Sequence, residues 1–190
     1  MFNFIIQCFN KIRIVYISKK LSNIGGNPYF GRRGVIVGGE GISIGEKFSI
    51  GDNFKLQVWT FLKENMEPPN LLIGDNVSMM DNCQISCSNR ITIGEGCLFG
   101  DNVFVTDNFH GKSIALELNI PPVDRKLYSK GSVIIGKNVW IGRNVCIMPG
   151  VTIGDGTVVG ANSVVTHDIL ENSVVAGVPA KTIRIIEEKR

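Results

Sequence analysis

The chain has 190 residues, enough for one domain or at most two small ones. Its 44% apolar and 19% charged residues exclude a disordered chain, and a net charge of +3 is too small to indicate a nucleic-acid-binding protein. The 22 glycines and 8% aromatic residues indicate many turns around a core of small branched aliphatic side chains.

The first 22 residues, "MFNFIIQCFNKIRIVYISKKLS", form an amphipathic, basic segment. Its uncharged run from Phe2 to Asn10 is too short to span a bilayer. Two arrangements stay open. The segment forms a short helix that packs on the domain, or residues 1–20 contact the inner face of a membrane, with Lys19 and Lys20 at anionic headgroups.

Cysteine usage predicts a reducing compartment. The five cysteines lie at positions 8, 83, 87, 97 and 146, and no secretory signal with a small-residue cleavage site precedes them. We therefore expect free thiols and a cytoplasmic protein. Cys83 and Cys87 are four residues apart, but no second cysteine pair or histidine cluster completes a zinc site, so no metal is predicted.

Residues 44–105 contain a loose six-residue rhythm of apolar residues. It falls into three sets: Ile44, Ile50 and Leu56; Ile73, Met79 and Ile85; Ile93, Phe99 and Val105. The gaps between the sets, "FLKENMEPPN" and "SCSNR", are rich in turn-forming and polar residues. A six-residue period is neither helical nor a simple strand alternation, and it indicates a short strand that turns and repeats.

The stretch "TDNFHG" holds one of the two histidines of the chain. The rhythm places Val105 and Phe109 inside and leaves Asp107 and His110 outside, at a turn. It then fails over residues 111–134, which we predict to be a loop insertion. A long loop inside a compact repeat is often a binding loop.

The rhythm becomes strict from residue 135. An aliphatic residue recurs every six positions, at Ile135, Ile141, Ile147, Ile153, Val159 and Val165. Glycine follows it at 136, 142, 154 and 160, where we expect the backbone to bend or adopt a positive φ. Small or branched residues come four positions after the aliphatics: Val139, Val145, Val151, Thr157 and Ser163.

Three such hexads close one coil, so residues 18 apart stack at about the inter-strand spacing of 4.8 Å. Ile135 then lies on Ile153, and Ile141 on Val159. The result is an all-β solenoid whose ends need covering. We assign the repeat domain to residues 23–186, with the N-terminal helix at one end and a C-terminal tail after the last coil.

Residues 139–184, "VWIGRNVCIMPGVTIGDGTVVGANSVVTHDILENSVVAGVPAKTIR", resemble the C-terminal half of hexapeptide-repeat acyltransferases. The resemblance extends over residues 35–186 and points to the sugar and xenobiotic O-acetyltransferase branch, including enzymes of bacterial surface polysaccharides. It implies a left-handed parallel β-helix, a homotrimer, and acetyl-CoA as donor and co-substrate.

The resemblance also implies site residues. Transfer of acetyl to a hydroxyl needs a base, and histidine suits that role near neutral pH. His110 matches the family's catalytic histidine beside a long loop. Asp107 either orients the imidazole or binds a sugar hydroxyl, and otherwise is an exposed turn residue. Asn82 falls close to the position where relatives contact the acceptor.

The donor side is implied in the same way. Arg143 and Ala161 are 18 residues apart, so they stack in one external column that a pantetheine arm would cross. Relatives contact the cofactor at the positions of Arg143, Ala161, Thr166 and His167. Lys181 and Arg184 match basic positions that meet the CoA phosphates. Trp140 is expected at an outward turn, in subunit packing or as a cofactor platform.

The leading hypothesis is therefore an acetyl-CoA-dependent O-acetyltransferase acting on a sugar of an O-antigen or capsule. The alternative acceptors are an antibiotic, a free sugar or serine. A γ-type carbonic anhydrase on the same fold needs three zinc-binding histidines, and this chain has two. A non-catalytic scaffold would not need His110 together with a matching cofactor tail.

Overall fold

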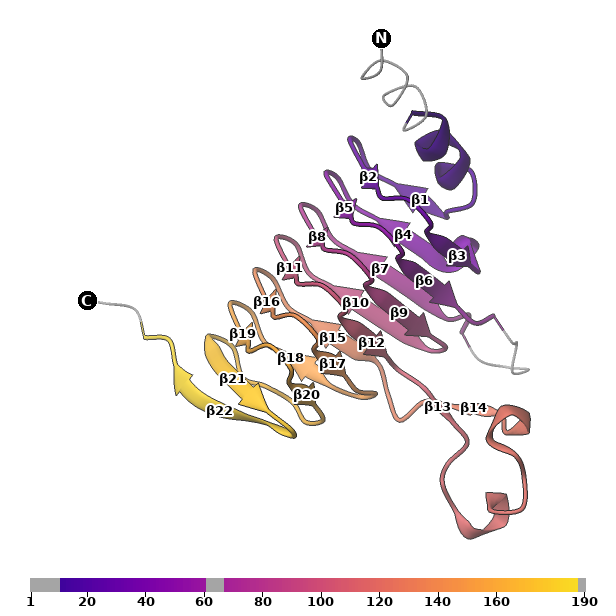
Figure 1. The fold of residues 1–190 in the computed structure, drawn as a ribbon, viewed down its shortest axis with the longest axis vertical. Coiled ribbons are helices and arrows are strands. Elements are labelled where there is room, and N and C mark those ends of the chain that lie inside the picture. Colours follow the sequence, from indigo (N-terminus) through magenta and orange to yellow (C-terminus); the bar gives the residue numbers. More distant parts are fainter. Residues whose placement is uncertain (1–10, 61–66, 188–190) are drawn as a thin grey trace.

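A computed structural model describes residues 11–60 and 67–187. Short parallel strands stack into a three-sided prism, with each turn of the chain contributing one strand to each side (Figure 1). A helix over residues 11–18 lies at the N-terminal end. This is the left-handed parallel β-helix that the family resemblance implies, with the predicted N-terminal helix at one end.

The three faces of the prism are three sheets. The first face contains β1 (Asn23–Ile24), β4 (Ile42–Ile44), β7 (Asn70–Ile73), β10 (Arg90–Ile93), β15 (Val133–Ile135) and β18 (Thr152–Ile153). The second contains β2 (Tyr29–Phe30), β5 (Ser49–Ile50), β8 (Ser78–Met79), β11 (Leu98–Phe99), β16 (Trp140–Ile141), β19 (Val158–Val159), β21 (Ser173–Gly177) and β22 (Ala180–Ile185). The third contains β3 (Val35–Val37), β6 (Lys55–Val58), β9 (Gln84–Cys87), β12 (Phe104–Thr106), β17 (Cys146–Ile147) and β20 (Val164–Val165).

The remaining short elements lie outside the faces. A 3-10 turn, η1 (Gly39–Gly41), follows β3. The predicted insertion leaves the prism as a stalk of two antiparallel strands, β13 (Phe109–His110) and β14 (Leu127–Tyr128), with η2 (Ala115–Glu117) and η3 (Pro122–Asp124) between them. At the C-terminus β22 folds back antiparallel on β21 and closes the second face.

The predicted stacking is confirmed in the second half of the chain. Ile135 pairs with Ile153 and Ile141 with Val159, each 18 residues on. Upstream the coil is longer, because Ile73 pairs with Ile93, 20 residues on. The two extra residues lie at the corner between β9 and β10. A coil that the hexad rhythm does not predict, β1 to β3, precedes the first predicted set.

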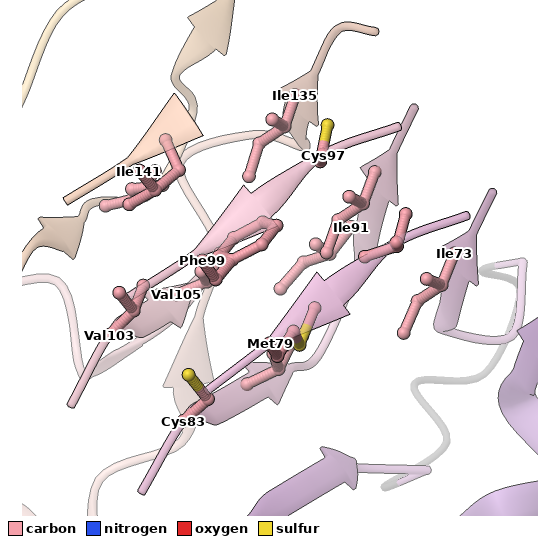
Figure 2. Close-up of a cluster of buried hydrophobic side chains, with 14 of the residues drawn as sticks. Ile73, Met79, Cys83, Ile91, Cys97, Phe99, Val103, Val105, Ile135 and Ile141 are labelled. Carbon is pink, nitrogen blue, oxygen red and sulfur yellow. The ribbon is translucent and has the colours of Figure 1, made fainter. Parts of the chain in front are cut away.

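The core is a set of internal columns that run along the prism. Figure 2 shows side chains from successive coils, including Phe99, Ile135 and Ile141, pointing into the same interior. The six aliphatic hexad residues from Ile135 to Val165 are at most 1% exposed. Near the N-terminus the interior is filled by phenylalanines, and the rings of Phe48 and Phe54 lie 5.6 Å and 5.8 Å from that of Phe30.

The corners show why particular residues recur, and they correct one expectation. Positive φ is found not at the glycine after each aliphatic but two residues later, at Asn138, Asn144 and Asn162. Asparagine tolerates this left-handed conformation better than most residues. The glycine is needed for close approach instead, because a Cβ on Gly142 would lie 2.6 Å from the backbone nitrogen of Ala161 in the next coil.

Three cysteines belong to the core. Cys83, Cys87 and Cys97 are buried free thiols, and their sulfur atoms donate to backbone carbonyls of Gly100, Asn70 and Gly136. Burial raises the pKa of Cys83 to about 11 and also raises the pKa of Cys97. These thiols are therefore packing residues with little thiolate near neutral pH.

The internal columns make a direct prediction about stability. Replacing the fully buried Ile153 with alanine should lower the free energy of unfolding by about 2–5 kcal/mol, because a cavity opens beside Ile135. Thr152→Ala, on the exposed side of the same strand, should change it by less than about 0.5 kcal/mol. Denaturant unfolding of the two variants measures the difference. Equal losses would mean that the column is not what stabilises the coil.

Candidate active site

The candidate site is built where the chain leaves the prism. β12 ends at the buried Thr106, and the chain passes through the buried Asp107 before it projects outward as the β13–β14 stalk. We call residues 108–132 the arm. Figure 1 shows the arm extending away from the three faces. The chain returns to the first face at β15.

The arm begins at residue 108, three residues before residue 111, where the hexad rhythm predicts that the insertion begins. Phe109 was expected inside, but it is 36% exposed and pairs with Tyr128 in the stalk. Asp107 was expected outside, but it is 0% exposed. On the third face the inward position that follows the hexad aliphatic is held by Val58 and Cys87 in the preceding coils, and Asp107 takes that position in the last coil before the arm.

His110 lies on the stalk, and its backbone pairs with that of Leu127. Its side chain is exposed, and among the described residues it makes no hydrogen bond or ion pair. The ring nitrogens are therefore free to accept a proton from a bound molecule. An imidazole held on a short strand pair at the base of a projecting loop is suited to general-base chemistry.

Asp107 is a structural clamp on the neighbouring coil. Its Oδ1 accepts from the backbone nitrogen of Ser88 at 2.7 Å, and its Oδ2 accepts from that of Asn89 at 2.9 Å. The Cys87 thiol donates to Oδ2 at 3.4 Å, and the Asn108 amide to Oδ1 at 3.1 Å. Burial and the Asp107 carboxylate together raise the pKa of Cys87 strongly, in that order of importance.

The ladder of backbone hydrogen bonds between successive coils explains this buried carboxylate. Along the prism, backbone nitrogens of one coil donate to carbonyls of the next, as Trp59 does to Cys87 at 2.8 Å. The nitrogens of Ser88 and Asn89 would lose such partners because the chain turns outward at Asn108. Buried amides without a partner are costly, so a carboxylate at position 107 replaces the missing carbonyls.

The same corner also holds the returning end of the arm. The Asn108 amide donates to the carbonyl of Ser86 at 3.0 Å, and the Asn89 amide donates to the Ser129 hydroxyl at 3.4 Å. Both ends of the arm are thus tied to residues 86–89. The hexad rhythm identifies "SCSNR" only as a gap between repeats. The signal in the sequence that could have identified this corner is its polar residues, which lie in a coil of 20 residues instead of 18.

Asn82 lies at a different corner of the prism. It has φ 60° and its Oδ1 accepts from the Asn53 amide at 3.0 Å. A similar chain of asparagine amides continues along this corner from Asn102 to Asn144 and Asn162. We call the corner between the second and third faces the asparagine edge. Asn82 has a structural role in it, and its contact with an acceptor stays a prediction.

Arg143 and Ala161 lie on the asparagine edge as a column. The strands before them pair Ile141 with Val159, and the nitrogen of Asn162 donates to the carbonyl of Arg143 at 2.8 Å. Both residues are exposed, as the sequence predicts. The guanidinium of Arg143 has one weak partner, with its Nε 4.0 Å from an oxygen of Asp101.

Thr166 and His167 lie on the other side of the third face. They follow β20, whose Val165 stacks on Ile147, which in turn stacks on Val105 of β12. They therefore lie along the corner from which the arm departs, which we call the departure edge. The Thr166 hydroxyl and Nδ1 of His167 are hydrogen-bonded at 2.8 Å.

Lys181 and Arg184 lie on β22, opposite Ala176 and Val174 of β21. Both are exposed, and within the part of the chain that the structure describes neither has an ion-pair partner. The sequence-predicted residues thus fall into separate groups. His110, Thr166 and His167 share the departure edge. Asn82, Arg143 and Ala161 share the asparagine edge. Lys181 and Arg184 on β22 form a third group.

Trp140 faces outward and is 53% exposed, as expected, but it lies on strand β16 of the second face and not at a turn. Within residues 11–60 and 67–187 no cluster of three or more histidine, cysteine or acidic side chains forms a metal site. No helix in the same residues is long and apolar enough to cross a membrane.

The clamp can be tested without knowing any substrate. Asp107→Ala should lower the free energy of unfolding by about 3 kcal/mol and speed tryptic cleavage in the arm, because two backbone amides lose their acceptor. Asp124→Ala, in the exposed η3 turn, is the control and should change neither. Thermal unfolding and limited proteolysis measure both effects. Wild-type behaviour of Asp107→Ala would show that the carboxylate does not hold the corner.

Comparison with known proteins identifies the repeat. A family model described as "Bacterial transferase hexapeptide (six repeats)" matches residues 132–167. The "Putative lipopolysaccharide biosynthesis O-acetyl transferase WbbJ" of Escherichia coli (strain K12) is 40% identical over 147 residues, covering 75% of this chain and 71% of that protein. The galactoside O-acetyltransferase of the same strain is 39% identical over 136 residues, covering 65% and 62%.

Solved structures share the fold. Galactoside acetyltransferase in complex with coenzyme A matches with a TM-score of 0.63 and 30% identity, over 93% of this chain and 70% of that chain. A mutant of AntD, an N-acyltransferase from Bacillus cereus, in complex with dTDP-4-amino-4,6-dideoxyglucose and coenzyme A, matches with a TM-score of 0.75 and 21% identity, over 93% and 90%. The hexads, the prism and the relatives together show that the chain belongs to the hexapeptide-repeat acyltransferases.

Proposed function

We propose that this chain is an acetyl-CoA-dependent O-acetyltransferase that acts on a sugar hydroxyl in the synthesis of a surface polysaccharide such as an O-antigen or capsule. The observation that carries the proposal is the exposed, unbonded imidazole of His110 at the departure edge. The relatives support the class, because they are named as O-acetyltransferases of lipopolysaccharide biosynthesis and of galactosides.

The proposed reaction uses His110 as the base. One ring nitrogen takes the proton of the acceptor hydroxyl while the oxygen of that hydroxyl bonds to the carbonyl carbon of the acetyl-CoA thioester. The carbon–sulfur bond then breaks, and the imidazolium returns its proton to the departing sulfur, so the products are an acetyl ester and free CoA. The base contributes by making a poor nucleophile reactive near neutral pH.

Asp107 has a different part in this proposal from the one that the sequence suggested. Both of its oxygens are engaged by the 87–89 corner and the residue is fully buried. We therefore assign it to holding the start of the arm, three residues before His110, and not to contact with the sugar. Asn82 remains the candidate acceptor contact.

The donor would be held by residues that the structure leaves accessible. Arg143, Lys181 and Arg184 present positive charge for phosphate groups, and Ala161 leaves space beside the asparagine edge. Thr166 and His167 lie on the departure edge with His110. Acetyl-CoA supplies the activated acyl group, and these residues would bind and orient it.

The two edges give a reason to propose a homotrimer. His110 and Arg143 lie on opposite sides of the third face of one chain, so one copy alone does not bring them together. A trimer in which the departure edge of one copy faces the asparagine edge of the next would complete the site. On the second face, Leu98 and Trp140 pair in neighbouring coils and are 39% and 53% exposed, which suits apolar contact between copies.

A cytoplasmic location accords with this proposal. The four described cysteines are free thiols, as expected in a reducing compartment. Among acceptors we favour a polysaccharide sugar over an antibiotic, a free sugar or serine, on the similarity to the lipopolysaccharide O-acetyltransferase.

An acceptor screen combined with His110→Ala tests the proposal. With acetyl-CoA and nucleotide sugars, lipid-linked glycans, free sugars, amino sugars and antibiotics, we expect CoA release with at least one sugar hydroxyl. His110→Ala should then lower kcat by about 10²–10⁴-fold, because the base is lost, while its unfolding profile is unchanged. The matched variant His167→Ala should raise the acetyl-CoA KM with a much smaller effect on kcat.

Two outcomes of that screen would count against the proposal. Release with amines or antibiotics and with no sugar would reject the sugar acceptor. Turnover of His110→Ala close to that of the wild type would reject His110 as the base.

The donor assignment has its own test. Lys181→Gln with Arg184→Gln should raise the acetyl-CoA KM by about tenfold and leave the acceptor KM nearly unchanged, because only the phosphate contacts are lost. Lys55→Gln, an exposed lysine on the third face, serves as the control for loss of positive charge. Steady-state kinetics with each substrate varied in turn separates the two constants. Equal increases in both would argue against phosphate contact at β22.

A further inference from the structure

The net positive charge of this chain comes from residues at one end of the solenoid. Residues 1–39 contain six basic residues and no acidic one: Lys11, Arg13, Lys19, Lys20, Arg32 and Arg33. The whole chain has a net charge of +3, so residues 40–190 carry a net charge of −3. The described part of this basic region is the N-terminal helix and the first coil, at the N-terminal end of the prism (Figure 1).

The N-terminal helix is held on the prism by one of its faces. Ile17 is buried, and Ile14 and Leu21 pack against the core. The backbone nitrogen of Ser22 then donates to the carbonyls of Gly39 and Ile42 at 3.0 Å, which joins the helix to the first coils. The orientation of the helix is therefore fixed by packing.

The opposite face of the helix is also apolar, and nothing in the described chain covers it. Ile12, Val15 and Tyr16 are 66%, 56% and 61% exposed. Their spacing of three and four residues puts them on one stripe, away from the packed face. A helix with a second apolar stripe would gain nothing from it in a monomer surrounded by water.

Lysines border this stripe. Lys11 precedes it, and Lys19 and Lys20 follow it in the next turn. Nζ of Lys20 lies 4.4 Å from the centre of the Tyr16 ring. We call Lys11, Ile12, Val15, Tyr16, Lys19 and Lys20 the basic stripe.

We infer that the basic stripe docks on the surface of a membrane containing anionic lipids, with the helix lying in the headgroup region. Ile12, Val15 and Tyr16 would enter the boundary of the acyl chains, while the lysine side chains would remain at the anionic headgroups. Apolar contact and charge attraction act together in such binding, and this helix presents both on one exposed face.

Charge complementarity favours lipid over other occupants. Pairing of the basic stripe with the same stripe of a second copy would bring like charges together, which is unfavourable. A nucleic acid would engage the lysines but would leave the apolar side chains unused. An anionic bilayer satisfies both kinds of side chain at the same time.

Docking would fix how the solenoid meets the membrane. The helix caps the first coil, so the N-terminal end of the prism would face the lipid, and the His110 stalk would stand several coils above it (Figure 1). As an extension that rests on the proposed function, the acceptor would be a lipid-linked glycan whose sugars reach up to the stalk. Lipid binding itself does not depend on the identity of the acceptor.

Vesicle co-sedimentation with the full chain tests the inference. We expect binding to phosphatidylglycerol–phosphatidylcholine vesicles at least about tenfold stronger than to pure phosphatidylcholine, and weakened by salt. Ile12→Gln with Val15→Gln, and separately Lys19→Gln with Lys20→Gln, should each reduce binding by about fivefold or more. The changed side chains of the apolar pair are exposed, so the unfolding temperature should stay close to that of the wild type.

A matched control separates a specific stripe from general hydrophobicity. Leu116→Gln with Val123→Gln removes two apolar side chains of the arm that are 86% and 80% exposed, and it should leave vesicle binding unchanged. No binding to anionic vesicles, equal binding to neutral ones, or wild-type binding by both stripe variants would overturn the inference. So would a stripe variant that changes the oligomeric state, measured by light scattering, without changing lipid binding.

The outcome is independent of the acetyl transfer test. A chain that acetylates a water-soluble sugar but ignores vesicles would reject the membrane surface and keep the proposed function. A chain that binds anionic vesicles through the basic stripe but releases no CoA with any acceptor would keep the membrane surface and reject the proposed function.

Discussion

The backbone ladder between successive coils is the constraint on which the rest of this structure depends. Each coil donates its amides to the carbonyls of the next, so every strand must lie in register with its neighbour. Columns of buried aliphatic residues maintain that register from inside. Because side chains alternate along the short strands, the outward positions and the corners are free to carry other chemistry.

The ladder also creates a problem wherever the chain leaves the prism. At the departure edge the corner amides of Ser88 and Asn89 lose their carbonyl partners, and the buried carboxylate of Asp107 takes the place of those carbonyls. The exit point of the arm is thereby fixed, and with it the base of the stalk that presents His110. The rigidity of a repeat fold is in this way transferred to a loop residue.

The family relationship gives this geometry its chemical meaning. Because the chain belongs to an acyltransferase family, we propose that the accessible imidazole of His110 serves a bound hydroxyl. The accessible basic residues are on the other side of the third face and on the last strand, which is why we propose that neighbouring copies complete one site. In this proposal the third face, with its edges, is a functional surface as well as a wall of the solenoid.

Much of this fold could be predicted from sequence because hexads are local. The strict repeat after residue 135 predicted the coil length and the inward residues, and the pairing of Ile135 with Ile153 confirms it. The longer upstream coils could not be read from a fixed period, since their extra residues lie in corners of no regular pattern. Nor could the pattern show that glycine serves close approach while asparagine provides the left-handed turn.

The site was less predictable for a related reason. His110 was singled out correctly as a residue outside the prism, but Phe109 and Asp107 were assigned to the wrong sides. A rhythm extended past its last strand cannot tell where the ladder ends, because that depends on which amides of the preceding coil need partners. Asn82 shows the same limit, since its turn conformation and amide bond are shared along a whole edge.

The most direct test of the central claim is a crystal structure of the chain with coenzyme A. If the departure edge is the reaction centre, the cofactor sulfur should lie within hydrogen-bonding reach of an imidazole nitrogen of His110, directly or through one water. Its phosphates should lie beside Lys181 or Arg184. A cofactor bound with its sulfur at another face, away from the stalk, would contradict the account.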